Sequence, residues 1–580
     1  MAVQQTVSQG MAAPQGVGEA VLVLQSGLAA KAVLRKGHRF KRLYPLIWRR
    51  EWLGKALDAI LDNSGSETPG VDGKRGSLLR DPDMRAKFLD ELQKKLRQRY
   101  RPSPVLRKYI PKASGEQRPI GIPTIKDRVV QMALKMLLEP IYEADFLPNS
   151  NGFRPQRSTL ECVLPIYKYG NRTTRYDWIL EGDIKGCFDN IDHKILMKAI
   201  QRRIADTRIL QLIWRFLKAP VIERGKRTKM TTGIPQGGAL SPTLANIYLH
   251  KFDQYWFAKW GQQNRSTRRT LRRKGQSSCV LFRYADDFIL CIKGTWNGAV
   301  NIRDDIIAYF SEQLKLNLTA SKTRVVLLEK GFDFLGFHIQ RQRLGRFRRV
   351  LIRPTYRNVA RLVVKLQKML GQTANADDPV TKIKAINRVL IGWANYYKAV
   401  NARKQFEFGD YVAKRLFQTW YQRRHSLSVQ ESFKQTRNRS QTFFTRSRQT
   451  TVLYQMTSLR SQHTSMNHKA CWKYRSIRNP YLQDSYETCL EDEPQPLVDT
   501  REAHPIQKQY DETYLINRIR TFDRDGWKCT QCSERLNLVA HHIEPVPVGK
   551  VLDPEVVHRV ENLETLCATC HHKKHLRHSA

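Results

Sequence analysis

Residues 279–292 read Cys-Val-Leu-Phe-Arg-Tyr, then Ala-Asp-Asp, then Phe-Ile-Leu-Cys-Ile. Two apolar runs that flank a short acidic turn are typical of a β-hairpin. The carboxylates at its tip, Asp286 and Asp287, are costly between buried strands unless a positive charge lies beside them. Another apolar run begins at Trp178 and leads into Asp183, which predicts a buried strand that ends in a third acid. The sequence therefore predicts a site that three carboxylates could complete.

Magnesium suits such a site, because it is a hard ion that prefers oxygen ligands and phosphates. Two ions held by Asp183, Asp286 and Asp287 can clamp the attacking 3′-oxygen and the departing pyrophosphate of nucleotidyl transfer. An Asp-Asp pair alone is a weak signal, since most such pairs form solvated turns. The surrounding residues must therefore decide between a turn and a catalytic site.

These surroundings resemble the reverse transcriptase family over roughly residues 65–340. The matching segments are Arg118-Pro-Ile-Gly-Ile-Pro-Thr124, Asn151-Gly-Phe-Arg-Pro155, Asp183-Ile-Lys-Gly-Cys-Phe-Asp189, Gly233-Ile-Pro-Gln-Gly-Gly-Ala-Leu-Ser-Pro242, Tyr284-Ala-Asp-Asp287 and Phe334-Leu-Gly-Phe337. The resemblance implies an RNA-directed DNA polymerase in which Asp183, Asp286 and Asp287 are the catalytic residues and bind Mg²⁺.

The same resemblance implies the residues that contact the incoming dNTP. Lys112 and Arg118 would hold its triphosphate from a hairpin predicted over residues 105–124, where cationic donors suit phosphate oxygens. Gln236 and Gly237 belong to the glycine-rich segment beneath the new base pair, and glycine permits close backbone approach there. Phe188 stands where the family has a ring that excludes a ribose 2′-OH; packing in the core is the alternative.

Composition points to nucleic acid as the partner. The 580 residues include 100 Lys and Arg against 53 Asp and Glu, a formal net charge of +47. Such an excess favours a long polyanion, because each neutralised phosphate releases counterions. Aromatic residues, 9% of the chain, are interleaved with the basic stretches and can stack on bases. No stretch reaches the roughly 18 apolar residues of a membrane span.

A second resemblance indicates the kind of reverse transcriptase. Ile391-Gly-Trp-Ala-Asn-Tyr-Tyr-Lys398 is similar to the maturase, or X, segment of group II intron-encoded proteins, which also serves as the thumb. Asn63 to Gly73 resembles the N-terminal extension of that family. The implied fold is an α+β multidomain protein: right-hand fingers and palm, an α-helical thumb, a basic DNA-binding segment and a zinc-stabilised ββα nuclease module.

The predicted boundaries are 1–38 for a disordered N-terminal extension, 39–345 for fingers and palm, 346–422 for the thumb and maturase X, 423–490 for the DNA-binding segment, 491–505 for an acidic, Pro-rich linker and 506–580 for the nuclease.

Three stretches in the middle of the chain are candidate contacts with nucleic acid. Trp393, Tyr396 and Tyr397 are suited to stacking on RNA, but equally to a core between helices. The DNA-binding role of the stretch 423–451 rests on its position and its basic charge alone. The Arg-rich segment 251–279 is a further candidate RNA contact.

Four cysteines near the end have the spacing of a metal site. Cys529 and Cys532 form one CxxC pair, and Cys567 and Cys570 form another. Such spacing indicates a metal rather than a secreted disulfide framework, and hence a reducing compartment. Four soft thiolates suit one tetrahedral Zn²⁺, which can replace a hydrophobic core in a small unit.

Histidines around these pairs resemble the HNH endonuclease family, whose ββα unit holds one divalent metal at a phosphodiester. By that resemblance His542 is the general base, and a neutral imidazole suits proton abstraction from water. His541, His571 and His575 hold the metal, for which Mg²⁺ is expected, and Asn562 orients the loop or the base. The alternative is that these histidines bind only phosphate or zinc.

The combined expectation is a multifunctional group II intron protein. It copies intron RNA into DNA from dNTPs, binds that RNA as a ribonucleoprotein to assist splicing, and nicks target DNA to expose a primer. One alternative is an RNA-binding splicing factor without polymerase activity, against which the intact Asp183, Asp286 and Asp287 speak. Another is a reverse transcriptase of a different lineage. We expect a cytoplasmic bacterial protein that joins the nucleoid when on DNA, or an organellar one, with no membrane association; oligomeric state is left open.

Overall fold

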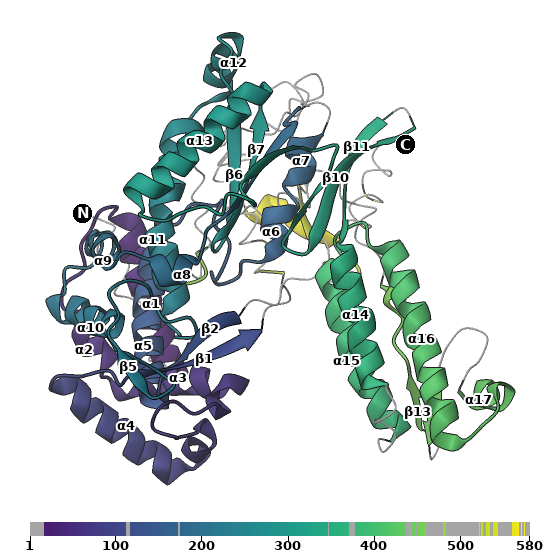
Figure 1. Cartoon of the computed structure of the whole chain (residues 1–580), viewed down its shortest axis with the longest axis horizontal. Helices are drawn as coiled ribbons and strands as arrows, with labels where there is room; N and C mark the ends of the chain where they lie inside the picture. Colours follow the sequence, from purple (N-terminus) through teal and green to yellow (C-terminus); the bar gives the residue numbers. More distant parts are fainter. Residues whose placement is uncertain are drawn as a thin grey trace. The chain divides into compact units, whose positions relative to one another are not determined.

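The chain forms two compact units, residues 1–493 and residues 494–580, which are described separately. The computed structural model describes residues 17–111, 117–171, 174–345, 347–370, 378–436, 443–446, 449–459 and 479–482, and in the second unit 521, 524–525, 529–533, 538–542, 560–567, 570 and 574 (Figure 1). Within these residues, no helix is both long and apolar enough to cross a bilayer.

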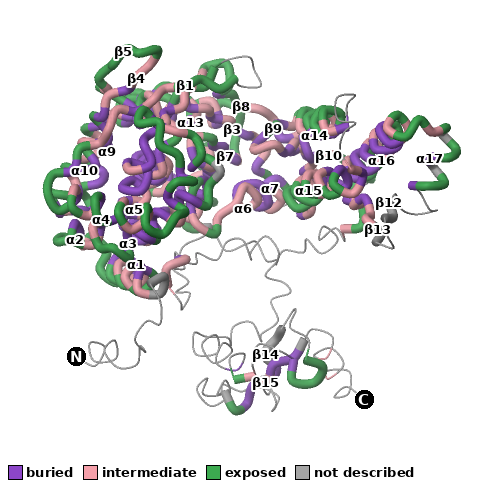
Figure 2. The backbone as a smooth tube through the Cα atoms, turned by 90° about the horizontal axis from the view of Figure 1, so that it is seen from below, coloured by how far each residue is buried: buried purple, intermediate pink, exposed green. Residues whose placement is uncertain are grey.

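Helix α5 (Ile125–Tyr142) forms the centre of the N-terminal part of the first unit, because most of its side chains are buried. It packs against α1 (Val17–Leu34) and α3 (Arg50–Leu61), and Figure 2 shows buried backbone around these helices. The indole of Trp52 is fully buried and donates to the carbonyl of Ala133 at 3.0 Å. The other helices of this part are α2 (Tyr44–Ile47), η2 (Ser64–Glu67), η3 (Gly76–Arg80), α4 (Pro82–Arg97), α9 (His193–Gln201) and α10 (Thr207–Leu217). Helices α6 (Thr159–Val163) and α7 (Ile166–Gly170) lie against the strands described below.

The expectation of a disordered extension over residues 1–38 is wrong for its described part. Helix α1 buries small apolar side chains there, among them Ala29 and Ala32. The side-chain amide of Gln25 donates to the carbonyl of Met136 on α5 at 2.8 Å. The charge-poor composition that suggested disorder instead lets α1 approach α5 closely.

The first sheet has the order β2-β1-β4-β5. Its strands are β1 (Val105–Pro111), β2 (Gln117–Ile122), β4 (Val221–Glu223) and β5 (Lys226–Thr228). The antiparallel pairing of β1 with β2 confirms the hairpin predicted over residues 105–124. The turn between these strands, with Lys112, lies outside the described residues.

The central sheet has the order β6-β7-β3-β8, and its neighbouring strands are antiparallel. Its strands are β3 (Trp178–Asp183), β6 (Ser278–Tyr284), β7 (Asp287–Lys293) and β8 (Arg324–Leu327). This confirms the predicted acidic hairpin and the buried strand that ends at Asp183. Helices α11 (Ser241–Trp256) and α13 (Trp296–Gln313) pack against the sheet through Phe252, Phe288 and Phe310, whose ring centroids lie 4.7 to 5.6 Å apart.

A third sheet leads into a layer of long helices. Its strands are β9 (Phe332–Phe334), β10 (Phe337–Leu344) and β11 (Phe347–Pro354), in the order β11-β10-β9, and the helices that follow are α14 (Tyr356–Met369), α15 (Pro379–Tyr397) and α16 (Arg403–His425). The three helices lie side by side (Figure 1). The helical structure that we predicted within residues 346–422 is therefore confirmed.

The described residues after this layer pack onto it rather than forming a separate segment. They comprise α17 (Val429–Thr436), β12 (Phe443–Arg446), β13 (Gln449–Val452) and η6 (Met456–Ser458). Met456 is fully buried, and the carboxylate of Asp410 on α16 accepts the backbone N–H groups of Met456 at 2.8 Å and Thr457 at 3.0 Å. The boundary that we predicted at residue 422 falls inside α16.

The second unit contains an antiparallel pair, β14 (Leu538–His542) and β15 (Leu563–Cys567), with η9 (Val560–Asn562) before β15. The carboxylate of Asp525 accepts the backbone N–H of Thr565 at 3.0 Å, and Arg524 donates to the carbonyl of Leu563 at 2.8 Å. These contacts fix the described residues 524–525 against β15.

Candidate active site and metal centre

Three carboxylates meet at one end of the central sheet. In the β3–β7 register Asp183 is directly opposite Asp287, and Asp286 lies on the turn that joins β6 to β7. Apolar, buried residues behind each acid form the strands that deliver it to this end. The structure therefore brings together the three predicted catalytic aspartates, although they lie about a hundred residues apart.

The carboxylates at this end of the central sheet favour a positive charge beside them. Desolvation, then the charges of Asp286 and Asp183, raise the pKa of Asp287 to about 6, although part of its side chain is exposed. Desolvation also raises the pKa of Asp286, and the charge of Asp183 adds to that rise. Lys322 and Arg118 oppose the rise in the pKa of Asp287 without cancelling it. The arrangement suits a cation with oxygen ligands.

Asp183 already has two donors. Its Oδ2 accepts from Thr319 Oγ1 at 2.8 Å and from Lys322 Nζ at 3.1 Å. A pocket of about 280 Å³ opens beside it, lined among others by Asp287, Lys322 and Asp333. The ammonium of Lys322, with a side chain 66% exposed, offsets one negative charge from the solvent side.

A buried arginine holds the turn that carries Asp286. Arg283 and Asp253 are each 0% exposed and form a two-point ion pair, with Nε to Oδ1 at 2.9 Å and Nη2 to Oδ2 at 2.5 Å. The other guanidinium nitrogen donates to the carbonyl of Ala285 at 2.8 Å and to Asn246 at 3.1 Å. Ala285 has φ +58, a conformation that non-glycine residues adopt only when the surroundings hold it.

Sequence reasoning missed Arg283, although a single arginine inside the apolar run 279–284 was a usable signal.

The predicted segment 151–155 supports the same turn from the other side. Asn151 N donates to Arg283 O at 2.9 Å, and Arg283 N donates to Asn149 O at 2.8 Å. A Cβ on Gly152 would come within 2.2 Å of the backbone nitrogen of Ala285. Only glycine therefore fits beneath the acidic turn.

The glycine-rich segment joins two predicted nucleotide-binding elements. Gln236 O accepts the backbone N–H of Gly121, on the strand of Arg118, at 2.6 Å. Gly237 has φ +115, and a Cβ there would lie 2.6 Å from the carbonyl oxygen of Gly121. On the other side Ile234 N donates to the carbonyl of Phe188 at 2.7 Å.

Arg118, Phe188, Gln236 and Gly237 are thus brought together through the backbone. Phe188 lies on the short helix α8 (Cys187–Asn190), and its half-buried ring packs against the core. Lys112 lies outside the described residues.

Two tyrosines that we expected either to stack on RNA or to fill a core hold the turn after β9 through their hydroxyl groups; Tyr397 is buried, and Tyr396 is exposed. Tyr396 OH donates to Leu335 O at 3.0 Å, and Tyr397 OH donates to Gly336 O at 3.1 Å. Trp393 packs against Tyr397 with ring centroids 4.7 Å apart. The three aromatic residues therefore attach α15 to the Phe334–Phe337 segment.

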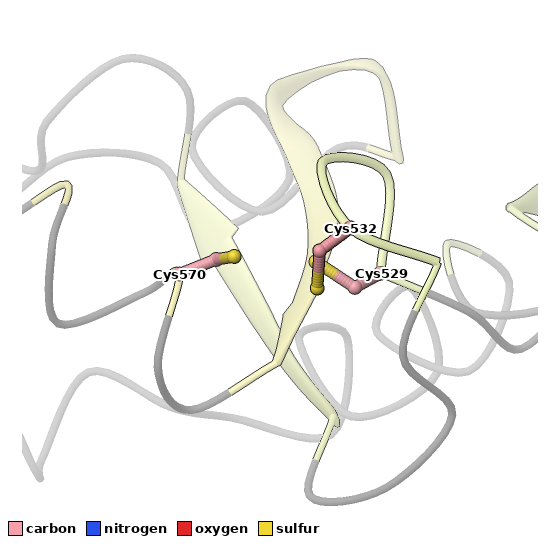
Figure 3. Close-up of side chains that lie close together, drawn as sticks. All are labelled: Cys529, Cys532 and Cys570. Carbon is pink, nitrogen blue, oxygen red and sulfur yellow. The ribbon is translucent and has the colours of Figure 1, made fainter.

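The second unit gathers three of the four predicted zinc ligands. The sulfur atoms of Cys529, Cys532 and Cys570 lie within 4.8 Å of one another (Figure 3). Cys567 ends β15, but its side chain is outside the described part. Such a cluster of thiols could bind a metal ion.

The predicted nuclease residues are only partly described. His541 on β14 and Asn562 in η9 are buried. His542 pairs with Leu563 through the backbone, and its side chain is not described. His571 and His575 lie outside the described residues.

Comparison with known families gives three matches along the chain. Residues 110–339 match the model of the reverse transcriptase (RNA-dependent DNA polymerase) family. Residues 359–439 match the group II intron, maturase-specific domain, and residues 529–577 match the HNH endonuclease family. The maturase match extends beyond the boundary that we predicted at residue 422.

Individual proteins are similar over about half of the chain. Protein YkfC of Escherichia coli is 38% identical over 345 residues, which cover 55% of this chain and 88% of that protein. The group II intron-encoded protein LtrA of Lactococcus lactis is 33% identical over 387 residues, which cover 57% of this chain and 62% of LtrA. A putative COX1/OXI3 intron 2 protein of Saccharomyces cerevisiae is 29% identical over 34% of its length.

The reverse transcriptase match and the acidic end of the central sheet define an RNA-directed DNA polymerase that is joined to a nuclease domain. Together with the maturase-specific domain, they show that the chain belongs to the group II intron-encoded reverse transcriptase/maturases with an HNH domain. The domains for polymerisation, maturation and DNA cleavage thus occur in one multifunctional chain.

Proposed function

We propose that Asp183, Asp286 and Asp287 form the polymerase centre with which this chain copies intron RNA into DNA. The observation that carries the proposal is the register that sets Asp183 opposite Asp287 beside the turn of Asp286. The donor set fits Mg²⁺, because its ligands are carboxylate oxygens, and burial together with their neighbouring charges raises the pKa values of Asp286 and Asp287. Two such ions would supply the charge that activates a primer hydroxyl and neutralises departing pyrophosphate.

In the proposed reaction the 3′-oxygen of a DNA primer attacks the α-phosphorus of a dNTP. The bond from that phosphorus to the bridging oxygen breaks, and pyrophosphate leaves. In a right-hand arrangement the central sheet is the palm, β1 and β2 belong to the fingers, and α14 to α16 form the thumb. Arg118 and Lys112 bind the triphosphate from the fingers, since cationic donors suit its oxygens.

The choice of deoxynucleotides is assigned to Phe188. Its carbonyl is tied to the glycine-rich segment, which fixes the backbone on which the half-buried ring stands. A ring held there would collide with a ribose 2′-OH. Replacing it by alanine is expected to let ribonucleotides in, with the dNTP/NTP preference falling by about tenfold or more. If only stability falls and the preference stays, Phe188 serves core packing alone.

The maturase-specific region is proposed to bind intron RNA and assist its splicing. The match over residues 359–439 and the net charge of +47 support this. The alternative of a splicing factor without polymerase activity is disfavoured because all three aspartates are present in one site. A reverse transcriptase of another lineage is disfavoured by the maturase and HNH matches.

The second unit is proposed to nick target DNA and so expose a 3′-hydroxyl for priming. Cys529, Cys532, Cys567 and Cys570 would hold one Zn²⁺, and the described thiols support this by their proximity. By family resemblance, His542 is the general base, Asn562 orients it, and the remaining histidines His541, His571 and His575 bind a divalent metal, with Mg²⁺ expected. This unit would provide the primer that the polymerase extends.

The polymerase proposal is tested by primer extension on an RNA template with dNTPs and Mg²⁺. Asp286→Asn is expected to abolish DNA synthesis while RNA binding stays near the parental value. Asp304→Asn, at a more exposed position on α13, is the matched control and should extend primers normally. Absence of DNA synthesis by the intact, RNA-bound chain would overturn the proposal and favour the splicing-factor alternative.

A further inference from the structure

The hairpin of β10 and β11 carries an arginine pair that is not part of the polymerase centre. Arg343 and Arg348 are directly opposite each other in the β10–β11 register. Like charges at opposed positions of a sheet destabilise it. Because side chains alternate along a strand, Arg343 shares a face with Ile339, which is fully buried further along β10. The pair thus extends the inward face of the hairpin beyond the hydrophobic core.

This face lines a pocket of about 660 Å³ at the far end of the central sheet. The lining includes Arg175 and Trp178 besides the arginine pair. Strand β3 begins at Trp178 and ends at Asp183. With a rise of about 3.3 Å per residue, the pocket lies about 17 Å from the polymerase centre, measured along the strand. It is therefore a separate site within the same unit.

The pocket carries more positive than negative charge. Arg341 Nη2 donates to Asp177 at 2.6 Å and also pairs with Glu329, so that one buried arginine engages both acids of the lining. Arg348 is 3.6 Å from Glu329. Among the described residues no carboxylate pairs with Arg175 or Arg343. Two guanidinium groups are thus left to attract an anion.

The positive field extends beyond the lining. Burial, then the charges of Arg272 and Arg175, lower the pKa of Lys293 at the end of β7. Arg272 belongs to α12 (Arg265–Arg273), in which five of the nine residues are arginine. Beside the pocket, Trp178 contacts Trp296 with ring centroids 5.0 Å apart, and Trp296 is 47% exposed. An exposed ring next to guanidinium groups can stack on an unpaired base.

We propose that this pocket binds the phosphodiester backbone of folded RNA through Arg175, Arg343 and Arg348. Guanidinium groups suit phosphate oxygens because their planar donors engage two oxygens at once. RNA is favoured over DNA by the maturase-specific match, and the inference rests on the proposed RNA-binding function. RNA held here would stay bound while the polymerase centre copies a template at the other end of the sheet.

The test uses the full chain and a short, labelled RNA duplex as the probe. An unlabelled RNA template with a dideoxy-terminated DNA primer first fills the polymerase cleft. Binding of the probe is then measured over about 50 to 200 mM salt for the parent and for Arg343→Gln/Arg348→Gln. Lys194→Gln/Lys198→Gln is the matched control, since both lysines are exposed on α9, which lies away from the hairpin in Figures 1 and 2.

Each lost phosphate contact should lower the salt slope by about one and the affinity by about eightfold near 0.1 M salt. The double variant should thus lose about two units of slope and about 60-fold in affinity, while the lysine control matches the parent. Primer extension should stay parental in both, which separates this inference from the polymerase proposal. An unchanged slope and affinity in the arginine variant, or absence of probe binding by the parent, would overturn the inference. An equal loss with a DNA duplex would overturn the assignment to RNA.

Discussion

The buried pair Arg283–Asp253 offers a test of how the acidic turn is held. Burial raises the pKa of Asp253, but the charge and hydrogen bonds of Arg283 outweigh it and lower that pKa to about 2. Arg283→Met leaves this carboxylate fully buried without its arginine partner, while Asn149 still donates to it at 3.1 Å. Breaking a buried pair in this way costs about 3–5 kcal/mol of folding free energy. We expect Arg283→Met to unfold at a clearly lower urea concentration than the parent.

A second substitution separates stability from catalysis. In Arg283→Met/Asp253→Leu both charges are replaced by apolar side chains, which is often neutral for stability or better. The double variant should therefore recover most of the lost free energy. It cannot recover the hydrogen bond to the Ala285 carbonyl or that to Asn246. Since these hold the turn of Asp286, its rate of primer extension should stay at least about tenfold below the parent, equivalent to about 1.4 kcal/mol.

The assays are urea unfolding followed by tryptophan fluorescence, and single-turnover primer extension on an RNA template. Parental stability of Arg283→Met would refute the reasoning about the buried charge. Parental extension by the double variant would refute the reasoning about the turn, because its geometry would then not depend on Arg283.

Three further outcomes are expected. The raised pKa of Asp287 is about 6. As the pH rises through that value, the stability of the metal-free protein should therefore fall and its apparent affinity for Mg²⁺ should rise. Calorimetry between about pH 5 and 7 checks this, and a pH-independent affinity would contradict it. Gly152→Ala should abolish primer extension. Gly65→Ala should leave it intact, because the added Cβ meets nothing within 4 Å. Equal activity of the two variants would contradict the proposed steric role of Gly152. Cys529→Ser should lower zinc content by mass spectrometry and stop DNA nicking with polymerisation unchanged; full zinc occupancy would argue against the cysteine site.

Local patterns predicted the parts of the fold that position the aspartates. Apolar runs before Asp183 and around Asp286 and Asp287 specify strands, and their acids are delivered to the same end by antiparallel pairing. The helices over residues 355–371 and 381–399 were predictable for the same reason, because their apolar residues recur at helical spacing. In these places the signal lies within one window of sequence.

Helix α1 was mispredicted because its signal is not local. Its sequence is apolar all round and poor in charge, without the two-faced pattern of a surface helix. What stabilises it is α5, more than a hundred residues away, which accepts the hydrogen bond of Gln25 at the carbonyl of Met136. Such a partner cannot be assigned from composition, so that a packed helix and a disordered tail look alike in the sequence.

The aromatic residues of α15 show the same limit at the candidate site. Tyrosines beside basic residues fit RNA stacking and core packing equally well, and the choice depends on a carbonyl 61 residues away in the sequence. In the structure the hydroxyl groups of Tyr396 and Tyr397 donate to the Leu335–Gly336 turn, and Tyr397 is 2% exposed. The buried ring of Tyr397 therefore has little surface to offer a base, whereas the ring of Tyr396 stays 38% exposed. Contacts with RNA must therefore come from side chains that are exposed. Arg343 and Arg348, which lie opposite each other on β10 and β11, meet that requirement.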